Sequence, residues 1–184
     1  MNSNTIVPGT VVGSVVGRPS VQQPVVPVRA GQQPLIPPEA QLPRGVNFYA
    51  DFSGCGYWRM IWPEHILNAY QKVIVQGSTI MIGDKNFYSG VKAIRIQRQA
   101  TPNQLKFVEF LKSIQGDCGF RLIYEIDDII FSEDIPDYNK FKPAFTDPVI
   151  RETSQKIMAM CDEITVTCDY MKNYYKEKLN FIYR

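Results

Sequence analysis

Residues 120–128, Phe120-Arg121-Leu122-Ile123-Tyr124-Glu125-Ile126-Asp127-Asp128, carry the strongest signal for the fold. Aromatic and β-branched residues occupy four of the first seven positions, which predicts a strand, and the acidic pair Asp127-Asp128 follows at its carboxyl end. A helical pattern precedes it, opened by Pro102 and closed by Gly116 and Gly119. Another helix follows from Asp147-Pro148. Strands separated by helices of this length predict βαβ units and a parallel sheet.

The rest of the chain from residue 46 continues this alternation. Expected strands cover residues 46–52, 79–82 (weaker), 92–97, 163–167 and 181–183, and expected helices cover 57–72 and 169–179. Pro63 lies inside the first of these helices, so the helix begins there or follows an irregular turn. Residues 132–146 predict an irregular segment. The predicted fold class is α/β, a Rossmann-like parallel sheet with helices on both faces, preceded by an extended Pro/Val-rich arm.

The arm spans residues 1–45, and the predicted domain spans 46–184. The arm holds 8 of the 13 prolines, nine valines and five glutamines, and it lacks aromatic residues. A hexapeptide repeats within it, at residues 22–27 and 32–37. Proline blocks helix interiors and central strands, and no large side chain is present to anchor a core. Two interpretations stay open: a disordered tail, or an extended peptide that docks on a protein partner, for which residues 5–45 are the candidate segment.

Charge and cysteine usage exclude several classes of function. The net charge of +2 arises within residues 1–45, and the other 139 residues carry 17 basic and 17 acidic side chains, which disfavours a nucleic-acid partner. Four cysteines without a CxxC pair and a single histidine disfavour a zinc site and a disulfide framework, so we expect a reducing, cytoplasmic setting. No apolar run is long enough for a membrane span, and the first residues do not predict a cleaved secretory signal.

Two segments that follow predicted strands are the candidate site, because ligands of open parallel sheets bind at the carboxyl ends of strands. The first is Ser53-Gly54-Cys55-Gly56, whose glycines allow close approach of a ligand to the backbone. The alternative is a plain strand-to-helix turn, and the dinucleotide fingerprint G-x-G-x-x-G is missing. The second is Glu125 to Asp128. Its carboxylates are suited to a sugar hydroxyl, a metal or a base, or else to helix capping and ion pairing.

Four segments in this order resemble the N-terminal half of GT-B-fold glycosyltransferases of the glycogen-synthase-like kind. They are residues 51–59 (DFSGCGYWR), 94–99 (IRIQRQ), 122–131 (LIYEIDDIIF) and 161–168 (CDEITVTC), and the resemblance covers residues 46–184. It implies a transferase that passes a sugar from a nucleotide-sugar donor to an unknown acceptor, with this half shaping the acceptor side. No metal is implied, since such a fold stabilises the leaving diphosphate with cations and helix dipoles.

The resemblance also implies roles for individual residues. Asp127 and Asp128 are the candidate catalytic pair at the acceptor. Ser53, Gly54, Cys55, Gly56, Arg59 and Glu125 are the candidate substrate-binding residues, with Arg59 near the donor phosphates. The donor-binding half of such enzymes would follow Arg184, so this chain alone is not expected to transfer sugar. The alternative function is a non-catalytic structural or decoration protein, held by the arm on a large assembly such as a virus particle.

Overall fold

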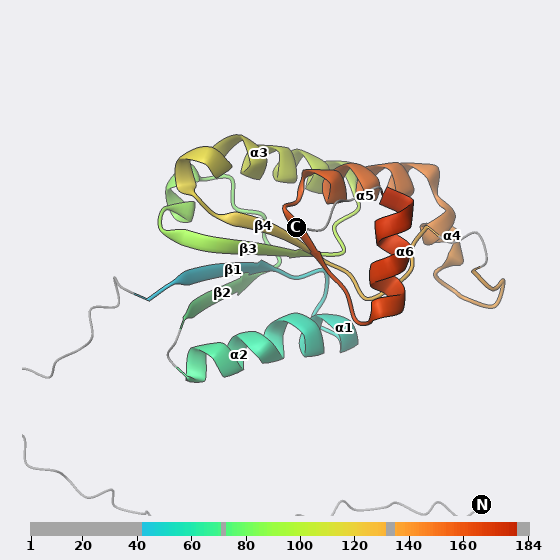
Figure 1. Ribbon diagram of the computed structural model, residues 1–184, viewed down its shortest axis with the longest axis horizontal. Coiled ribbons are helices and arrows are strands. Elements are labelled where there is room, and N and C mark those ends of the chain that lie inside the picture. The colour runs from blue at the N-terminus through green and yellow to red at the C-terminus, as the bar shows by residue number, and fades with distance from the viewer. Residues whose placement is uncertain (1–41, 71–72, 132–134, 180–184) are drawn as a thin grey trace, which may run out of the picture. The chain divides into compact units, whose positions relative to one another are not determined.

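The computed structural model describes residues 42–70, 73–131 and 135–179. In these ranges the chain forms a parallel sheet in the order β2-β1-β3-β4-β5 (Figure 1). The strands are β1 (Arg44–Phe48), β2 (Ile74–Ser78), β3 (Val91–Gln97), β4 (Arg121–Glu125) and β5 (Glu163–Thr165). The prediction of an α/β, Rossmann-like fold is confirmed. The strand order reverses between β1 and β3, which is the switch point of a doubly wound sheet.

Helices cover both faces of the sheet, as predicted. One face carries α3 (Pro102–Cys118) and α5 (Pro148–Met160), and the other carries α1 (Gly54–Gly56) and α2 (Trp62–Ala69) (Figure 1). A π-helical turn, η2 (Tyr57–Ile61), joins α1 to α2, so an irregular turn does precede Pro63. The other helical elements are the 3-10 turn η3 (Lys85–Tyr88), α4 (Lys142–Thr146) and α6 (Asp169–Leu179).

The two long helices of the first face have strong local signals at their ends. Thr101 and Gln104 form a capping box at the start of α3, and Gly119, with φ of 75°, ends that helix in the left-handed conformation. The carboxylate of Asp147 accepts hydrogen bonds from the backbone N–H groups of Val149 and Ile150 at the start of α5. These caps explain why both helices begin where the sequence predicts.

The face covered by α3 and α5 is the hydrophobic core. Alternate residues of the three central strands β1, β3 and β4 point to it and are buried: Val46, Phe48, Ile94, Ile96, Leu122 and Tyr124. The helices contribute Phe107, Val108, Leu111, Ile114, Ile157 and Met158. Burying one such aliphatic or aromatic side chain contributes about 1.5–3 kcal/mol. This core therefore supplies most of the free energy that holds the sheet to its helices.

Several predicted boundaries are wrong. The strand expected at 79–82 lies earlier, as β2, where the side chain of Asn68 pairs with the backbone N–H and carbonyl of Val75. Strand β1 ends at Phe48, because the chain then turns toward the glycine loop. Helix α3 continues through Gly116, and the short helix α4 interrupts the segment expected to be irregular.

Other expectations fall wholly or partly outside the described residues. The strand expected at 181–183 and the first 41 residues of the arm lie there. Within the described ranges, β1 already begins at Arg44.

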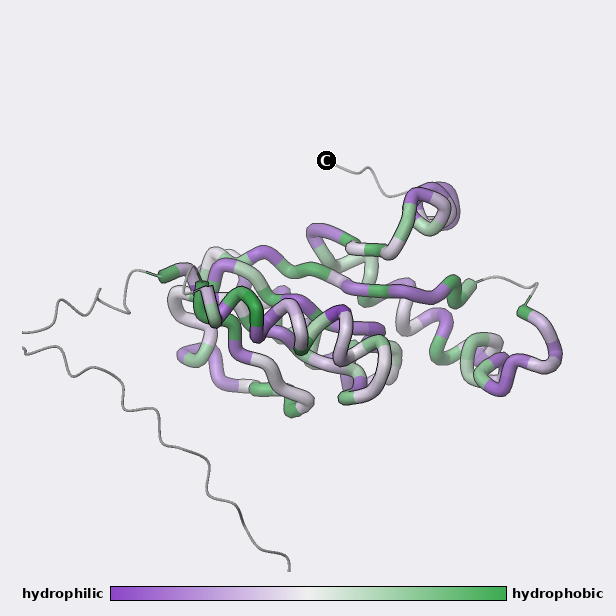
Figure 2. Tube along the Cα trace, turned by 90° about the horizontal axis from the view of Figure 1, so that it is seen from below, coloured by the Kyte–Doolittle hydropathy of each residue, from purple (hydrophilic) through white to green (hydrophobic). Residues whose placement is uncertain are grey.

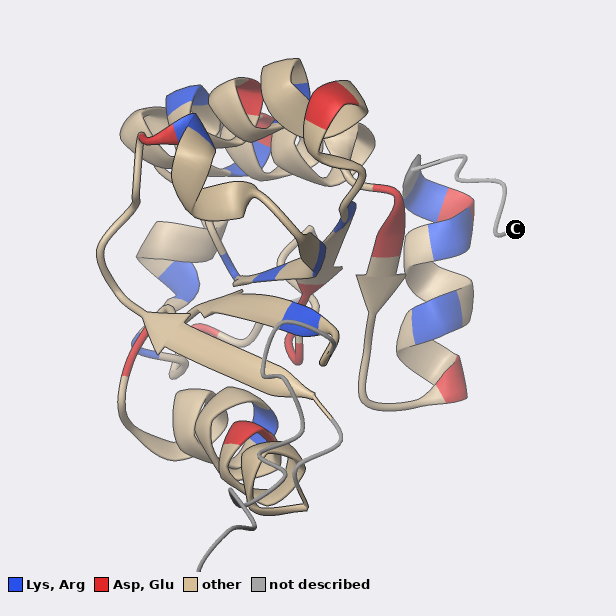
Figure 3. Ribbon diagram, turned by 90° about the vertical axis from the view of Figure 1, so that its left-hand side faces the viewer, with Lys and Arg blue, Asp and Glu red and all other residues tan. Residues whose placement is uncertain are grey.

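Hydropathy varies along the longer helices. None of the described helices is both long enough and apolar enough to cross a bilayer, and Figure 2 shows hydrophilic and hydrophobic residues interspersed along the trace. Basic and acidic residues also alternate over the ribbon in Figure 3.

Candidate functional site

The candidate site lies at the switch point, where the segments after β1, β3 and β4 meet. Asp51 lies three residues after β1, and Arg98 directly follows β3. Asp127 and Asp128 lie just beyond β4. Because β3 is hydrogen-bonded to both β1 and β4, these charged side chains converge at one edge of the sheet.

Arg98 is the centre of the cluster. Its Nη2 lies 2.6 Å from Asp51 Oδ2, its Nη1 lies 3.1 Å from Asp128 Oδ2, and its Nε lies 3.8 Å from Asp127 Oδ1. Burial alone would lower the pKa of Arg98, but the carboxylates of Asp127 and Asp51 outweigh it and raise the pKa. The guanidinium therefore stays charged and holds three carboxylates at the edge of the sheet.

The backbone of Arg98 is strained. Its φ is 46°, in the left-handed region that costs a non-glycine residue about 1–2 kcal/mol. Its N–H donates to the carbonyl of Glu125, 3.0 Å away, so the residue is fixed between β3 and β4. Residues held in such conformations by their surroundings cluster at functional sites.

The glycine loop is tied to this cluster through Asp51. Oδ1 of Asp51 accepts hydrogen bonds from Ser53 N at 2.8 Å and from Ser53 Oγ at 2.9 Å. Burial alone would raise the pKa of Asp51, but these hydrogen bonds and Arg98 outweigh it and lower the pKa. Gly56 is buried, and a Cβ there would lie 2.0 Å from the carbonyl oxygen of Asp51, so this position admits only glycine. Gly54 faces open space.

Cys55 lies beside the acidic pair. Hydrogen bonding to Asp127, together with burial, raises the pKa of the Cys55 thiol to about 11. The thiol is therefore protonated at neutral pH, which argues against a role as a nucleophile.

An open cavity of about 290 Å³ lies beside the cluster, on the α5 side of the sheet. Asp51 and Arg98 contribute its charged part. Tyr124, Ile126, Ile130, Phe145 and Ile150 contribute its apolar part. The volume is near the lower end of the range for small-molecule pockets, and an apolar wall with a few polar groups is the usual composition of such pockets.

One buried hydroxyl lines this cavity. Ser154, on α5, is fully buried, and its Oγ has no hydrogen-bond partner within the described ranges. It lies near the phenol of Tyr124, which donates its hydrogen bond to the carbonyl of Gln99, 3.0 Å away. A buried polar group without a partner costs about 1–3 kcal/mol, so a ligand that bonds to it recovers that free energy.

Helix α6 holds the loop that carries the acidic pair. The phenol of Tyr175 donates to the carbonyl of Asp128 and accepts the N–H of Ile130 at 3.3 Å. Tyr175 is fully buried, and burial raises its pKa. Asp128 is thereby placed with its carboxylate half-exposed at the rim, while the Asp127 carboxylate is mostly buried.

Glu125 and Arg59 pair with each other on the opposite face of the sheet from the cavity. Strand alternation sends Tyr124 and Ile126 to the cavity and Glu125 toward η2, where its carboxylate contacts Arg59. Burial raises the pKa of Glu125 despite that partner. Of the predicted residues, Asp127, Asp128 and the glycine loop therefore meet at Arg98, whereas Arg59 and Glu125 form a separate pair.

Sequence reasoning missed Asp51, Arg98 and Ser154 as site residues. Asp51 and Arg98 lie within three residues of the carboxyl ends of β1 and β3, so their position was the available signal. No local pattern marks Ser154, which reaches the cavity only through the packing of α5 on the sheet. No group of three or more His, Cys, Asp and Glu side chains in the described part of the chain is placed to hold a metal ion.

Comparisons with known proteins give no relative for this chain. No family model matches it, and neither a curated protein nor a solved structure matches it.

Proposed function

We propose that this domain is the acceptor-side half of a nucleotide-sugar-dependent glycosyltransferase, and that its cavity binds a hydroxyl-rich acceptor. The observation that supports the proposal is the cavity at the switch point, with an apolar wall, a charged rim and a buried, unpartnered hydroxyl. Sugars present both apolar C–H faces and hydroxyl groups, so a pocket of this composition suits them. The resemblance of residues 51–59, 94–99, 122–131 and 161–168 to the GT-B N-terminal half points to the same chemistry.

The acidic pair has distinct roles in this proposal. Oδ1 of Asp127 is buried and lies 3.8 Å from Nε of Arg98, and in this proposal it accepts a hydrogen bond from a sugar hydroxyl. Asp128 is the more exposed carboxylate of the pair, and both carboxylates lie next to Arg98, which lines the cavity. In a transfer reaction the acceptor hydroxyl loses its proton as it attacks the donor, and a carboxylate within hydrogen-bond reach accepts that proton. Arg98 keeps both carboxylates in position.

The nucleotide-sugar donor would approach from the glycine loop. Arg59 is the basic residue that the resemblance assigns to the donor phosphates, and its side chain is one quarter exposed while paired with Glu125. A diphosphate would therefore compete with Glu125 for this guanidinium. Arg98 is the second cation at this edge, and its three carboxylate partners already satisfy it.

The test is a titration of the full chain, labelled with ¹⁵N, followed by amide chemical shifts. The probes are glucose, N-acetylglucosamine, maltose and UDP, each added alone. We expect one of the sugars to shift the amides of Ala100, Ile126, Ile130 and Ser154. Replacing Ser154 by Ala should leave the free energy of unfolding unchanged or higher and weaken sugar binding by about 2- to 10-fold, because one neutral hydrogen bond is lost.

The matched control is Ser113→Ala, which removes an exposed hydroxyl on α3 that bonds to the carbonyl of Phe110. This variant should bind sugar as the native chain does. Absence of sugar-induced shifts at the cavity, or equal binding by Ser154→Ala, would overturn the proposal. Shifts with UDP alone and none with the sugars would assign the site to a nucleotide instead.

Residues 5–45 support a second proposal, that this segment attaches the domain to a protein partner within a large assembly such as a virus particle. The observation is its composition, with eight prolines in the first 45 residues, many valines and a repeated hexapeptide. Protection of this segment from protease in the intact assembly, and its cleavage in the isolated chain, would support attachment. Equal cleavage in both would overturn it.

A further inference from the structure

The helical segment η2–α2 is inverted relative to an ordinary surface helix, because its polar side faces the sheet. The side chain of Arg59 contacts Glu125, and Nδ2 of Asn47 donates to Glu64 Oε2 at 3.1 Å. Asn68 binds the backbone of β2. Figure 3 shows the charged residues of this helix on the side toward the sheet. A surface helix normally turns its apolar stripe to the core and its charges to water.

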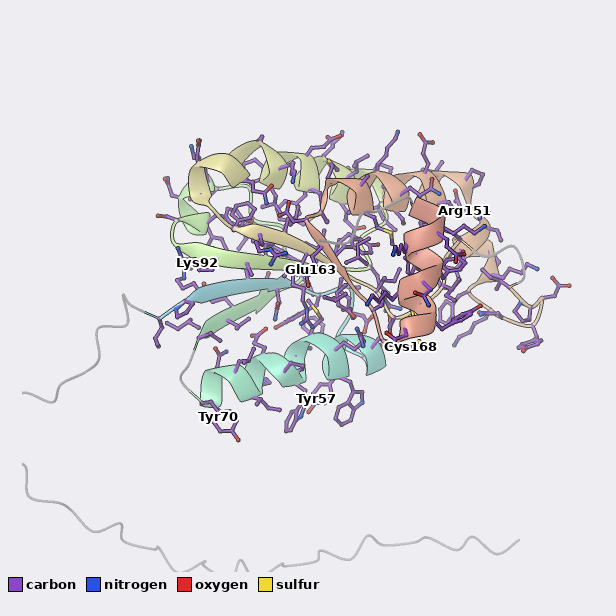
Figure 4. The ribbon with its side chains drawn as sticks, viewed as in Figure 1. Tyr57, Tyr70, Lys92, Arg151, Glu163 and Cys168 are labelled. Atoms are coloured by element: carbon purple, nitrogen blue, oxygen red, sulfur yellow. The ribbon has the colours of Figure 1, made fainter. Side chains whose placement is uncertain are left out.

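The outward side of the same segment is apolar. Trp58, Trp62, Ile66 and Tyr70 recur at every fourth position and form one line along the helix, and their exposed fractions are 65%, 45%, 39% and 72%. Tyr57 and Leu67 flank the line and are also exposed. We call these six residues the outer stripe. Figure 4 shows the labelled Tyr57 and Tyr70 on the side of the helix away from the sheet.

The aromatic rings of the outer stripe contact one another. Tyr57 packs edge-on against Trp58 with ring centroids 5.2 Å apart, and it stacks on Trp62 at 6.2 Å. These contacts join neighbouring side chains into a continuous surface. A contiguous exposed apolar patch marks an interaction site, whereas single exposed apolar residues are ordinary.

We infer that the outer stripe is the interface of a two-fold symmetric homodimer, in which the η2–α2 segments of two copies pack across each other. Because the ridge runs at i, i+4, two copies can interdigitate their ridges at a crossing angle of about −50°, the commonest helix-packing class. A two-fold axis brings the same patch on each copy together, so the stripe needs to be complementary only to itself.

The area and the charge of the stripe fit a second copy. If a fully exposed aromatic side chain presents about 150–250 Å², the stripe exposes on the order of 600 Å². Two copies then bury on the order of 1,200 Å², the lower limit for a stable specific interface. Arg59 and Glu64 are the Lys, Arg, Asp or Glu residues between residues 57 and 70, and both are engaged on the sheet side. His65 is exposed, but no Lys, Arg, Asp or Glu side chain of this segment lies on the outward side to oppose self-association. The same lack of outward basic residues argues against a membrane surface, which such helices bind through Lys and Arg.

The native chain carries its own reporter of this interface. Its two tryptophans, Trp58 and Trp62, both lie in the outer stripe. We expect light scattering with size-exclusion chromatography to give twice the mass of the chain at about 100 μM, a concentration chosen because an interface at the lower size limit is expected at the weak, micromolar end of the affinity range. When the protein is diluted until the dimer dissociates, the tryptophan emission should shift to longer wavelength, because the indole rings become exposed to water.

The variant Ile66→Glu places a charge in the middle of the stripe and leaves both tryptophans in place. It should be monomeric at every concentration, with red-shifted emission and an unchanged circular dichroism spectrum. The matched control is Tyr138→Glu, an equally drastic change at a side chain that is 90% exposed outside the stripe. This control should dimerise as the native chain does.

Three results would overturn the inference. The first is a native chain with the mass of one copy at about 100 μM, or an Ile66→Glu variant that still dimerises. The second is a monomer with blue-shifted emission at all dilutions, which would mean that the chain covers the stripe itself. The third is a monomer that sediments with phosphatidylcholine or phosphatidylserine vesicles. None of these results bears on sugar binding, because the cavity lies on the other face of the sheet.

Discussion

The two faces of the sheet hold their helices by different chemistry. Toward α3 and α5 the strands present Phe48, Ile94 and Leu122, and the ring of Phe48 meets Phe107 of α3 edge-on at 4.9 Å. Toward η2–α2 the same strands present Asn47 and Arg95, whose partners are side chains and backbone groups of the helix. Successive side chains along these strands therefore point alternately into an apolar core and into a polar layer.

This difference shows that alternating apolar and polar residues in a parallel strand do not imply that one face of the sheet is exposed to water. Strands covered on both sides usually have near-continuous hydrophobic sequences. Here the polar half of the alternation is covered by a helix whose inward side is polar as well. The apolar side of that helix is left on the outside, where it forms the outer stripe. The polar residues of the strands therefore indicate an interface on the outer side of the covering helix and not on the sheet itself.

The largest effect is expected on the apolar face. Leu111, on α3, is fully buried, and Leu111→Ala removes its isopropyl group and leaves a cavity. We expect the free energy of unfolding to fall by about 2–5 kcal/mol, measured by urea denaturation. The matched control is Val149→Ala on α5, where the side chain is 55% exposed and the change should stay within about 0.5 kcal/mol. Equal losses in the two variants would contradict a core on this face.

Sequence reasoning located most elements because their signals are local. The Asp147-Pro148 start of α5 and the full range of α6 were predicted, since a cap and a proline act within one turn. Strand β2 was predicted at residues 79–82, a few residues after its actual position, because the apolar residues around Ile80 are typical of a strand. Ile80 is in fact 73% exposed, and the strand uses Gly77, which has no side-chain signal at all.

The site was predictable only in part. Loops that follow parallel strands meet at one edge, so the glycine loop and the acidic pair were expected together. The central residue, Arg98, was not expected as a site residue, because its role depends on the left-handed backbone after β3 and on carboxylates from two other segments. Strand alternation places Ile126 on the opposite face from Glu125, and Ile126 does line the cavity. It did not reveal that Glu125 pairs with Arg59 away from that cavity.

A smaller effect is expected on the polar face, at Gly77 in β2. A Cβ at this position would lie 1.4 Å from the hydroxyl of Tyr49, which donates to the carboxylate of Glu64 on α2. Gly77→Ala must therefore displace the contact that holds α2, and overpacking of this kind costs about 1–3 kcal/mol in urea denaturation. Gly83→Ala is the control, because a Cβ there meets open space. A neutral Gly77→Ala would show that α2 is held by other contacts.

The smallest effect distinguishes the faces by pH. Asp162 touches the α3 side: burial alone would raise its pKa, but hydrogen bonds from the Leu122 N–H, Lys112 and Gln115 outweigh it and lower the pKa. Burial raises the pKa of Glu125 on the α2 side. A lowered carboxyl pKa stabilises the fold above the unfolded value of about 3.9, and this stability is lost as the pH falls through the folded pKa.

A raised carboxyl pKa acts in the opposite sense, so stability falls as the pH rises above the unfolded value of about 4.3 for glutamate. We therefore expect the native chain to gain stability relative to Asp162→Asn as the pH rises from about 2 to about 4. The gain ends near the pKa of aspartate in the unfolded chain, about 3.9. Relative to Glu125→Gln it should lose stability as the pH rises above about 4.3, by at most about 1.4 kcal/mol per pH unit. Urea denaturation of the three proteins across this range measures both slopes. Slopes of the same sign would mean that the buried carboxylate of Glu125 is stabilised by Arg59 rather than penalised by burial.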